Sequence, residues 1–558
     1  MGDIMGVKGT ICTKGGNATK RTECIAMILA GGKGARLGAL TDHTAKPAIH
    51  FGGNYRIIDY TLINCAYSGI DTVGVLTQYR ASGLYDYLHN NSAWEWDKPD
   101  GGLHMLSSSD VGAPYTGTAN AVYNNIEFID RYNPEHVLIL SGDHIYKMDY
   151  RKMLRFHSEK NADATISVVS VPWEETYRFG IIDAVDDGRI TAFTEKPHEP
   201  KSNLASMGIY IYKWNCLKQY LTDDHNNICS DHDFGKDVIP AILSAGAKLY
   251  AYNFNGYWRD VGTLLSLWEA NMDLLSENHN IKLNKKYRQK FMSGSSDAPK
   301  YTSQHLNIKN CIVSDGCDIY GRIENSVVYG AATVAEGALV VDSVLMPGAV
   351  IGRNTNIFKT FIGHNAIIGE DVSIGTNFGT TMYCDDKLCS NGISLIGPGV
   401  YINNNMKIAK NSHVVIWNDS YLLGNEQIDR QHKQLFELVS DLTASCLDGS
   451  AAAKLKEAMD FLLDYTVRHF SDEEALQLQY CYPEYDEHKQ QHEDFALTIS
   501  VLAHRFSEKG SSEKLSSEVT RIVARWLIEH IQREDKKIRK HIQSRLLQQG
   551  QTATIGGG

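Results

Sequence analysis

Hydrophobic and polar positions follow three different patterns in succession along the chain. Up to about residue 284, short apolar runs of β type alternate with stretches of helical periodicity, and the clearest runs are Cys24–Ala30, Val73–Thr77, His136–Leu140 and Ala164–Val171. Strands that alternate with helices are typical of a parallel sheet covered by helices on both faces. The pattern therefore predicts a Rossmann-like α/β domain over residues 23–291.

A second rhythm, close to six residues, extends from about Ile308 to Ile416. Small or apolar residues recur with glycine close by, most clearly at residues 349–352, 366–369 and 372–375. A hexapeptide period is typical of a parallel β-helix, whose coils bury a common core by stacking. We expect a left-handed parallel β-helix over residues 305–416, after a linker at 292–304. The alternative is a run of ordinary short strands with glycine turns.

Beyond Trp417 the pattern is helical. His432, Leu435, Phe436 and Val439 lie at i, i+3, i+4 and i+7, the core stripe of an amphipathic helix. Similar segments occur near 428–446, 452–478, 484–507 and 513–546, and their short connections predict an all-α four-helix up-down bundle over residues 417–547. The polar residues 1–22 are predicted to form a mobile tail, and 548–558 a disordered one.

Charge and composition narrow the classes of partner. The formal net charge is −11, without long acidic or basic blocks, which argues against nucleic acid and anionic membranes as main partners. No apolar run approaches the ~18 residues of a membrane span. The eleven cysteines are scattered, and none has C-x-x-C spacing. We therefore expect reduced thiols and a cytoplasmic location.

A glycine-rich turn follows the first predicted strand. Gly31, Gly32 and Gly34 would let backbone amides approach phosphates closely, although the turn is neither a Walker A motif nor a dinucleotide fingerprint. Such turns are common, so this one indicates little by itself. Asp143 follows the strand at His136–Leu140, where open α/β sheets bind ligands. With Asp260 it could hold Mg²⁺ against phosphate oxygens.

Longer strings around these positions carry a resemblance. Eight motifs occur in the following order: GGKGARL, AKPAIHFGGNYRIIDY, YTGTANAV, GDHIYKMDY, FTEKP, ASMGIYIY, HDFGKDVIP and YWRDVG. From about Ile25 to Val415 the sequence resembles glucose-1-phosphate adenylyltransferase, the ADP-glucose pyrophosphorylase of bacterial glycogen synthesis. The resemblance implies that ATP and α-D-glucose 1-phosphate give ADP-glucose and pyrophosphate. It also implies a homotetramer.

The resemblance assigns roles to individual residues. Asp143 and Asp260 would hold Mg²⁺, Arg36 and Lys46 would stabilise charge on the triphosphate, and Lys196 would bind the phosphate of glucose 1-phosphate. The residues expected to line the sugar-phosphate pocket are Tyr115, Gly180, Glu195 and Ser206. Activated members carry a lysine where His43 stands here, which puts activation by a sugar bisphosphate in doubt.

Metal-binding residue types gather in the helical region. His469 and Glu473 lie at i, i+4, as do His488 and His492, so each pair shares one helical face. The other candidates are His432 in the first helix and the i, i+5 pair His530 and Asp535 in the last. Imidazoles with carboxylates suit iron, manganese or zinc.

The order H…HxxxE…HxxxH…HxxxxD, preceded by IDRQH at residues 428–432, resembles bacterial hemerythrin from Ile416 to about Ile542. The resemblance implies a non-haem centre of two irons, bridged by Glu473 and Asp535, with terminal ligands His432, His469, His488, His492 and His530. It implies one open position for reversible binding of O₂. Leu435, Phe495 and Trp526 are apolar candidates for excluding water from it.

Three hypotheses for the whole protein remain. The first is an active adenylyltransferase with an O₂- or redox-responsive module. The second is a catalytically silent regulatory subunit whose main activity is O₂ binding or iron storage; the intact glycine turn, Asp143 and Lys196 argue against it. The third is that the two parts share a chain without coupling. Artificial joining is a further alternative, although residues 414–417 contain no Gly/Ser linker.

Overall fold

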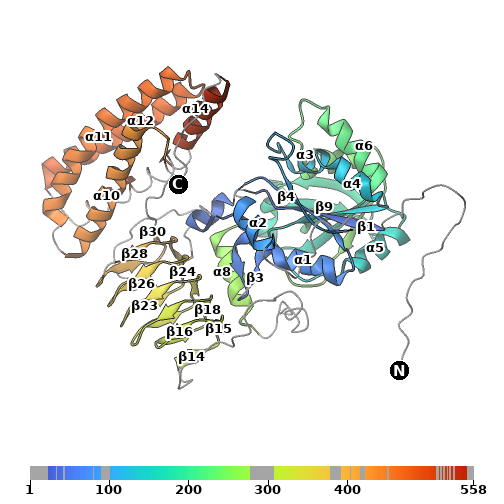
Figure 1. Cartoon of the computed structure of the whole chain (residues 1–558), viewed down its shortest axis with the longest axis horizontal. Coiled ribbons are helices and arrows are strands. Elements are labelled where there is room, and N and C mark those ends of the chain that lie inside the picture. Colours follow the sequence, from blue (N-terminus) through green and yellow to red (C-terminus); the bar gives the residue numbers. More distant parts are fainter. Residues whose placement is uncertain are drawn as a thin grey trace, which may run out of the picture.

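A computed structural model of the chain describes residues 23–548 with some gaps. The gaps are residues 33, 42–43, 54, 80, 90–100, 277–306, 378–390, 403, 415–421, 449–450, 511–514, 516–517, 520–521, 524–525, 527–529 and 532–533. The tail expected at 1–22, the linker expected at 292–304, residues 549–558 and His43 therefore lie outside the described residues. Figure 1 shows an α/β part, a β-helix and a helical part in succession along the chain.

The α/β part is built on a sheet with the order β10-β9-β11-β6-β1-β4-β5; β8 also pairs with β11, and β12 pairs with β8. Strands β1 (Cys24–Leu29), β4 (Thr72–Thr77), β5 (Gly102–Ser107) and β6 (His136–Ser141) pair in parallel, as predicted. The rest of the sheet comprises β8 (Ala164–Ser170), β9 (Gly180–Ala184), β10 (Ile190–Glu195), β11 (Leu204–Lys213) and β12 (Leu249–Asn253).

The expectation of purely parallel pairing is wrong for part of this sheet. Strand β11 runs antiparallel to β6, β8 and β9, and β9 runs antiparallel to β10. The turn between β9 and β10 is too short for the crossover that parallel strands need, so the two form a hairpin. Small antiparallel pairs join β2 (His50–Phe51) to β3 (Tyr55–Arg56) and β7 (His144–Tyr146) to β13 (Trp258–Asp260).

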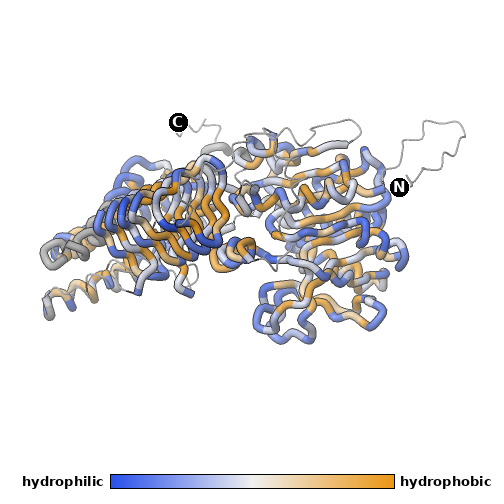
Figure 2. The backbone as a smooth tube through the Cα atoms, turned by 90° about the horizontal axis from the view of Figure 1, so that it is seen from below, coloured by the Kyte–Doolittle hydropathy of each residue, from blue (hydrophilic) through white to orange (hydrophobic). Residues whose placement is uncertain are grey.

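Two apolar layers enclose the sheet, as expected for strands buried on both faces. In β1, Ile25 and Met27 belong to one core cluster, whereas Ala26 and Ile28 belong to the other. Figure 2 shows the apolar strands between more polar outer segments. The α-helices of this part are α1 (Ile57–Tyr67), α2 (Ala81–His89), α3 (Thr118–Tyr123), α4 (Ile126–Tyr132), α5 (Tyr150–Glu159), α6 (Trp214–His225), α7 (Ile239–Ser244) and α8 (Leu264–Asp273).

The hexapeptide region forms three parallel ladders, which confirms the predicted β-helix. The first contains β14 (Ile308–Lys309), β17 (Arg322–Glu324), β20 (Leu339–Val341), β23 (Asn356–Phe358), β26 (Ser373–Thr376) and β29 (Lys407–Ala409). The second contains β15 (Ile312–Val313), β18 (Val327–Val328), β21 (Val344–Leu345), β24 (Thr360–Ile362), β27 (Ser394–Ile396) and β30 (His413–Val414). The third contains β16 (Asp318–Ile319), β19 (Thr333–Val334), β22 (Val350–Ile351), β25 (Ile367–Ile368) and β28 (Tyr401–Ile402).

The β-helix and the α/β part share one apolar core. Leu37 and Leu267 of the α/β part belong to the same buried cluster as Val344 and Phe361 of the β-helix. Polar contacts fix the junction: the Tyr329 hydroxyl donates to Asn271 at 2.8 Å and accepts from the backbone N–H of Gly52 at 3.1 Å. The two parts are therefore packed as one unit rather than joined by a linker alone.

The C-terminal part is helical, as the periodicity predicted. Its helices are α10 (Glu426–Asp448), α11 (Ala451–Gln479), α12 (Tyr485–Lys509) and α14 (Lys536–Gln548), and the described positions at 515, 518–519, 522–523 and 526 are helical too. Residues 530–531 and 534–535 have the wider hydrogen-bonding of a π-helix. Within the ranges that the structure describes, every helix is too short or too polar to cross a membrane.

Candidate functional site

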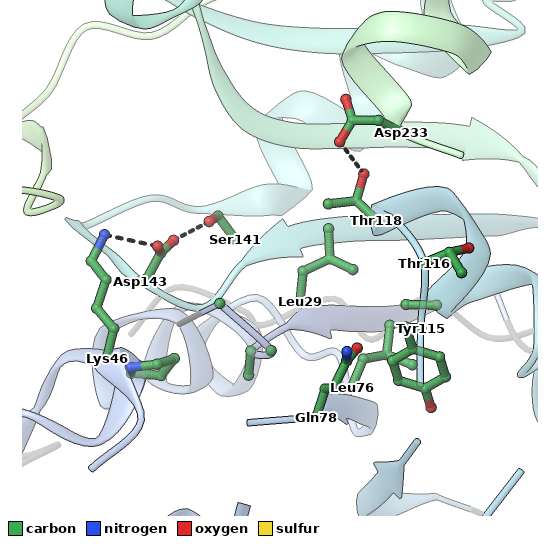
Figure 3. Close-up of a pocket in the computed structure, with 16 residues that line it drawn as sticks. Leu29, Lys46, Leu76, Gln78, Tyr115, Thr116, Thr118, Ser141, Asp143 and Asp233 are labelled. Atoms are coloured by element: carbon green, nitrogen blue, oxygen red, sulfur yellow. Dashed lines mark hydrogen bonds and ion pairs between the residues drawn. The ribbon is translucent and has the colours of Figure 1, made fainter. Parts of the chain in front are cut away.

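A pocket opens at the carboxyl ends of the parallel strands, where open α/β sheets bind ligands. Its volume is about 390 Å³. The predicted residues that line it are Gly31, Gly32, Lys46, Tyr115 and Asp143. Figure 3 shows Lys46 and Asp143 at one end of the pocket and Tyr115 and Gln78 at the other. The glycine turn and the candidate charged groups therefore face one cavity.

Lys46 lies between the two carboxylates predicted to hold Mg²⁺. Its Nζ atom is 2.8 Å from Oδ2 of Asp143 and 3.3 Å from Oδ1 of Asp260. Asp143 follows the end of β6, and the pairing of Asp260 in β13 with His144 in β7 brings the second carboxylate beside it. Strand pairing thus unites residues that are far apart in the sequence.

Charges at this site offset the cost of burial. Burial alone would raise the pKa of Asp143, but the positive charge of Lys46 and the neighbouring His144 hold it well below its usual range. Burial would likewise raise the pKa of Asp260, but the charge of Lys46 and the neighbouring His144 lower it. Burial would lower the pKa of Lys46, but the two carboxylates raise it. Both carboxylates are ionised at neutral pH, as hard-cation ligands must be.

Several residues at this site escaped the sequence analysis. His144 Nε2 is 3.6 Å from Asp143, Arg178 Nη2 is 3.6 Å from Asp260, and Ser141 donates a short hydrogen bond to Asp143. Gln78 lines the pocket directly after β4. Its position at the carboxyl end of a parallel strand was the signal that could have found it, because the same rule singled out Asp143.

Arg36 lies near Asp260, one of the two carboxylates. A methyl group added at Gly262 would lie 2.9 Å both from Nη2 of Arg36 and from Oδ1 of Asp260. The guanidinium group is therefore near the carboxylate pair, while the Arg36 side chain remains exposed.

The residues predicted to bind the sugar phosphate come from β9, β10, β11 and the segment before α3. Lys196 Nζ is 2.9 Å from Oε1 of Glu195, and Gly180 pairs with Glu195 across the β9–β10 hairpin. The Lys196 side chain is 60% exposed, which leaves it accessible to an anion. Two hydroxyl groups are already engaged: Ser206 donates to Tyr210 at 3.2 Å, and Tyr115 accepts from Asn125 at 3.0 Å.

The bundle brings all seven predicted metal ligands together in its interior. Ligand atoms of Glu473, His488, His492 and His530 lie within 4.8 Å of one another, and so do those of His432, His469 and Glu473. Asp535 completes the cluster, with Oδ2 3.3 Å from Nε2 of His432 and Oδ1 3.3 Å from Nε2 of His530. Glu473 belongs to both groups and therefore connects them.

A π-helical turn explains the unusual spacing in the last helix. Residues five apart diverge on an α-helix, but a π-helix bonds i to i+5 and places them on one side. Residues 530–531 and 534–535 have π-helical hydrogen bonding, and His530 and Asp535 are each 1% exposed. The turn therefore presents both ligands to the cluster.

Several of these donor atoms have the surroundings expected of metal ligands. Nε2 of His469, Nε2 of His488, Oε2 of Glu473 and both carboxylate oxygens of Asp535 are buried and make no hydrogen bond of good geometry, although other donor atoms of the cluster lie 2.9–3.5 Å away. Burial lowers the pKa of His469 and that of His492 to about 4, so these imidazoles are neutral, the form that binds metals. Burial would raise the pKa of Glu473, but its histidine neighbours lower it well below its usual range.

Aromatic rings enclose one side of the cluster. The Trp526 ring stacks on His530 with 3.8 Å between centroids and on Phe495 with 4.1 Å. Phe470, which the sequence analysis missed, stacks on His492 at 4.0 Å. Leu435 is fully buried in the same core. These contacts support the prediction that apolar neighbours exclude water from the centre.

The fold and the pocket define a nucleotidyltransferase, and residues 25–277 match the family model described as Nucleotidyl transferase. The chain is 46% identical to the glucose-1-phosphate adenylyltransferase of Acetivibrio thermocellus over 409 residues, which are 73% of this chain and 95% of that relative. It is 50% identical to the enzyme of the same name from Bacillus mycoides over 358 residues, which are 64% of this chain and 95% of that relative. The chain belongs to the glucose-1-phosphate adenylyltransferase family.

Two further family models match the rest of the chain. Residues 297–396 match the model described as GlmU-like, C-terminal hexapeptide, in agreement with the β-helix. Residues 423–542 match the model described as Hemerythrin HHE cation binding domain. The chain therefore carries a C-terminal hemerythrin domain, and the predicted relationship to both families is confirmed.

Proposed function

We propose that this chain transfers AMP from ATP to α-D-glucose 1-phosphate and gives ADP-glucose and pyrophosphate for glycogen biosynthesis. The observation that carries the proposal is the position of Lys46 between Asp143 and Asp260 at the end of a pocket that includes Gly31 and Gly32. The name shared by the relatives supports this choice of substrates.

The reaction is a displacement at the α-phosphorus of ATP. A phosphate oxygen of glucose 1-phosphate forms the new P–O bond, and the bond to the bridging oxygen breaks, so that pyrophosphate leaves with its electron pair. Positioning and charge neutralisation dominate such a reaction. Mg²⁺ held by Asp143 and Asp260 would supply positive charge to the phosphate oxygens.

The chain's own groups supply the rest. The backbone amides of Gly31 and Gly32 would contact the phosphates, and Arg36 and Lys46 would neutralise the charge that develops on the departing pyrophosphate. Lys196 would bind the sugar phosphate, and its high exposure is consistent with that role. Tyr115, Gly180, Glu195 and Ser206 would shape the sugar side.

Release of pyrophosphate tests this proposal. The full-length chain is assayed with ATP, glucose 1-phosphate and Mg²⁺, and UTP or CTP replaces ATP in parallel reactions. We expect ADP-glucose as the main product. Absence of any nucleotide sugar would overturn the proposal and favour the alternative of a catalytically silent subunit.

We further infer that the hemerythrin domain holds two irons. His432, His469, His488, His492 and His530 would be terminal ligands, and Glu473 and Asp535 would bridge. With both irons bound, the centre would bind O₂ reversibly. Iron analysis and the visible spectrum test this, because two irons per chain and an oxo-bridge band in air are expected. Zinc or manganese at full occupancy would contradict it.

We propose that the iron centre reports oxygen or redox state to the enzyme. The ligand Asp535 directly precedes α14, and Lys540 of that helix has its Nζ atom 5.9 Å from the centre of the Tyr79 ring. Tyr79 follows Gln78, which lines the nucleotide pocket. A movement of Asp535 would therefore shift α14, and the contact between Lys540 and Tyr79 would transmit that shift to the nucleotide site. Equal kinetics for the deoxygenated and oxygenated protein would refute the coupling.

We also infer a homotetramer, because the family resemblance implies one, and a cytoplasmic location, because the scattered cysteines indicate reduced thiols. Light scattering of the purified chain tests the mass of the assembly. A monomer at micromolar concentration would contradict it.

A further inference from the structure

Three histidines of the metal centre have acceptors on the ring nitrogen that faces away from the cluster. Nδ1 of His469 lies 2.9 Å from Oε1 of Gln431, and Nδ1 of His530 lies 3.0 Å from Oε1 of Gln491. Nδ1 of His492 lies 3.1 Å from Oε1 of Glu474. Two of these partners are neutral amides, whereas the third is a carboxylate.

The carboxylate differs from the amides in its negative charge. The amide of Gln431 donates to Asp472 at 2.7 Å and so presents its oxygen to His469. An ionised carboxylate can only accept hydrogen bonds and adds a negative charge as well. Glu474 therefore requires the proton of neutral His492 to sit on Nδ1. The lone pair of Nε2 must then face the cluster, where Nε2 of His530 lies only 3.0 Å away.

We infer that Glu474 is a positioning residue that fixes His492 as an iron ligand and stabilises the ferric state of the iron bound there. The inference rests on the proposed di-iron function. A carboxylate on the far nitrogen makes an imidazole a stronger electron donor, and partners of this kind alter metal affinity by about 10–100-fold. The more oxidised ion gains most from added negative charge.

The surroundings of Glu474 strengthen its effect on His492. His492 is 1% exposed, and Phe470 stacks on its ring at 4.0 Å, so the ring has little freedom to turn. The Glu474 side chain is 20% exposed and lines a cavity of about 480 Å³ at the surface between α11 and α12. It thus places a negative charge between solvent and a buried ligand.

A simpler explanation is that Glu474 serves only a surface ion pair. Lys489 Nζ lies 3.8 Å from its Oε2 atom, which is long for a strong pair and is partly exposed to water. The hydrogen bond to His492 is shorter and reaches a buried ring. Glu493 lines the same cavity and offers a matched comparison, because it carries the same charge and has an exposed side chain.

The test compares Glu474→Gln with Glu493→Gln in the full-length chain. Both variants lose one charge from the same cavity, and Glu474→Gln keeps a hydrogen-bond acceptor of the same shape. Iron content, the visible spectrum and the midpoint potential are measured for each. For Glu474→Gln we expect a tenfold or larger shift toward the ferrous state, which is a rise of about 59 mV for one electron. We expect no such shift for Glu493→Gln.

Each outcome decides the inference. Loss of iron from Glu474→Gln with retention by Glu493→Gln also supports it, since ligand orientation is then lost. Equal shifts in both variants would mean that only surface charge matters, and unchanged potential and iron content in Glu474→Gln would overturn it. Far-ultraviolet circular dichroism shows whether either variant is folded. A wild-type chain without iron would refute the di-iron proposal itself.

Discussion

Lys46 and Asp143, which lie 97 residues apart, form a partly buried ion pair with 2.8 Å between Nζ and Oδ2. The same lysine contacts Asp260, so one cation balances two carboxylates. Lys46 stabilises the charges of both carboxylates, and they stabilise the charge of Lys46. The three groups therefore do not gain or lose protons independently of one another. Removal of one carboxylate should leave the lysine paired.

The first prediction concerns Asp143→Asn. The variant should stay folded, because Asp260 still neutralises Lys46, but kcat should fall by about 10²–10³-fold through loss of charge stabilisation. Steady-state assays of pyrophosphate release over a range of Mg²⁺ concentrations measure the effect. Asp186→Asn, in an exposed turn, is the control. Full activity of Asp143→Asn would rule out its role.

The second prediction concerns pH and the contact between the α/β part and the β-helix. His50 Nδ1 and His364 Nε2 lie 3.1 Å apart across it. Burial and the charge of Arg56 lower the pKa of His50 to about 3 and that of His364 to about 4. An unfolded histidine has a pKa near 6.5, so below that pH the unfolded chain binds more protons and stability falls.

Between pH 7 and pH 5 the loss should be about 2 kcal/mol per histidine, and the decline should continue until the pH reaches the folded-state pKa values. Urea unfolding at both pH values measures it. His364→Gln should weaken the dependence, whereas the exposed His198→Gln should not. The same pH dependence in both variants would contradict this account.

The third prediction concerns removal of the metal. Without a cation, the two acidic side chains Glu473 and Asp535 are buried close together with no full positive charge to balance them, which destabilises the bundle. Ferrous iron at a hundredfold excess over its dissociation constant should stabilise the bundle by about 2.7 kcal/mol. Thermal unfolding followed by helical circular dichroism, with and without iron, measures this. Glu473→Gln should abolish the gain, and the exposed Glu508→Gln should preserve it.

The fourth prediction isolates the contact between the bundle and the enzyme. Lys540→Ala should leave iron content and basal activity unchanged but reduce any difference in kcat or KM between deoxygenated and oxygenated protein. Lys537→Ala is the matched control on the same helix, because Lys537 pairs with Glu484 and Glu534 inside the bundle. An oxygen response that survives unchanged in Lys540→Ala would show that another route carries it.

Local patterns predicted much of this molecule. The strands β1, β4, β6 and β8 lie where apolar runs were found, and the i, i+4 pairs of histidine and glutamate do share one face. These features depend on neighbours in the sequence. The position of Asp143 followed from a general rule about the ends of parallel strands.

Features set by distant pairing were not predicted. The antiparallel course of β11 depends on which strand edge remains open, and the link between Lys46 and Asp260 depends on the pairing of β7 with β13. The π-helical hydrogen bonding at residues 530–531 and 534–535 has no sequence periodicity that would predict it. Phe470 escaped notice because its value lies in stacking on His492, from a different helix.

Because the α/β part and the β-helix share a core, the α/β part cannot complete its packing until the ribosome has synthesised the β-helix. Leu37 and Leu267 are made early, yet their buried cluster also contains Phe361 and Leu395 of the β-helix. At about 5–20 residues per second, a ribosome takes on the order of ten seconds to pass from one set to the other. During that interval the nascent enzyme exposes an unfinished apolar surface. Chaperones that bind such surfaces should therefore act on this chain before its hemerythrin domain has been translated.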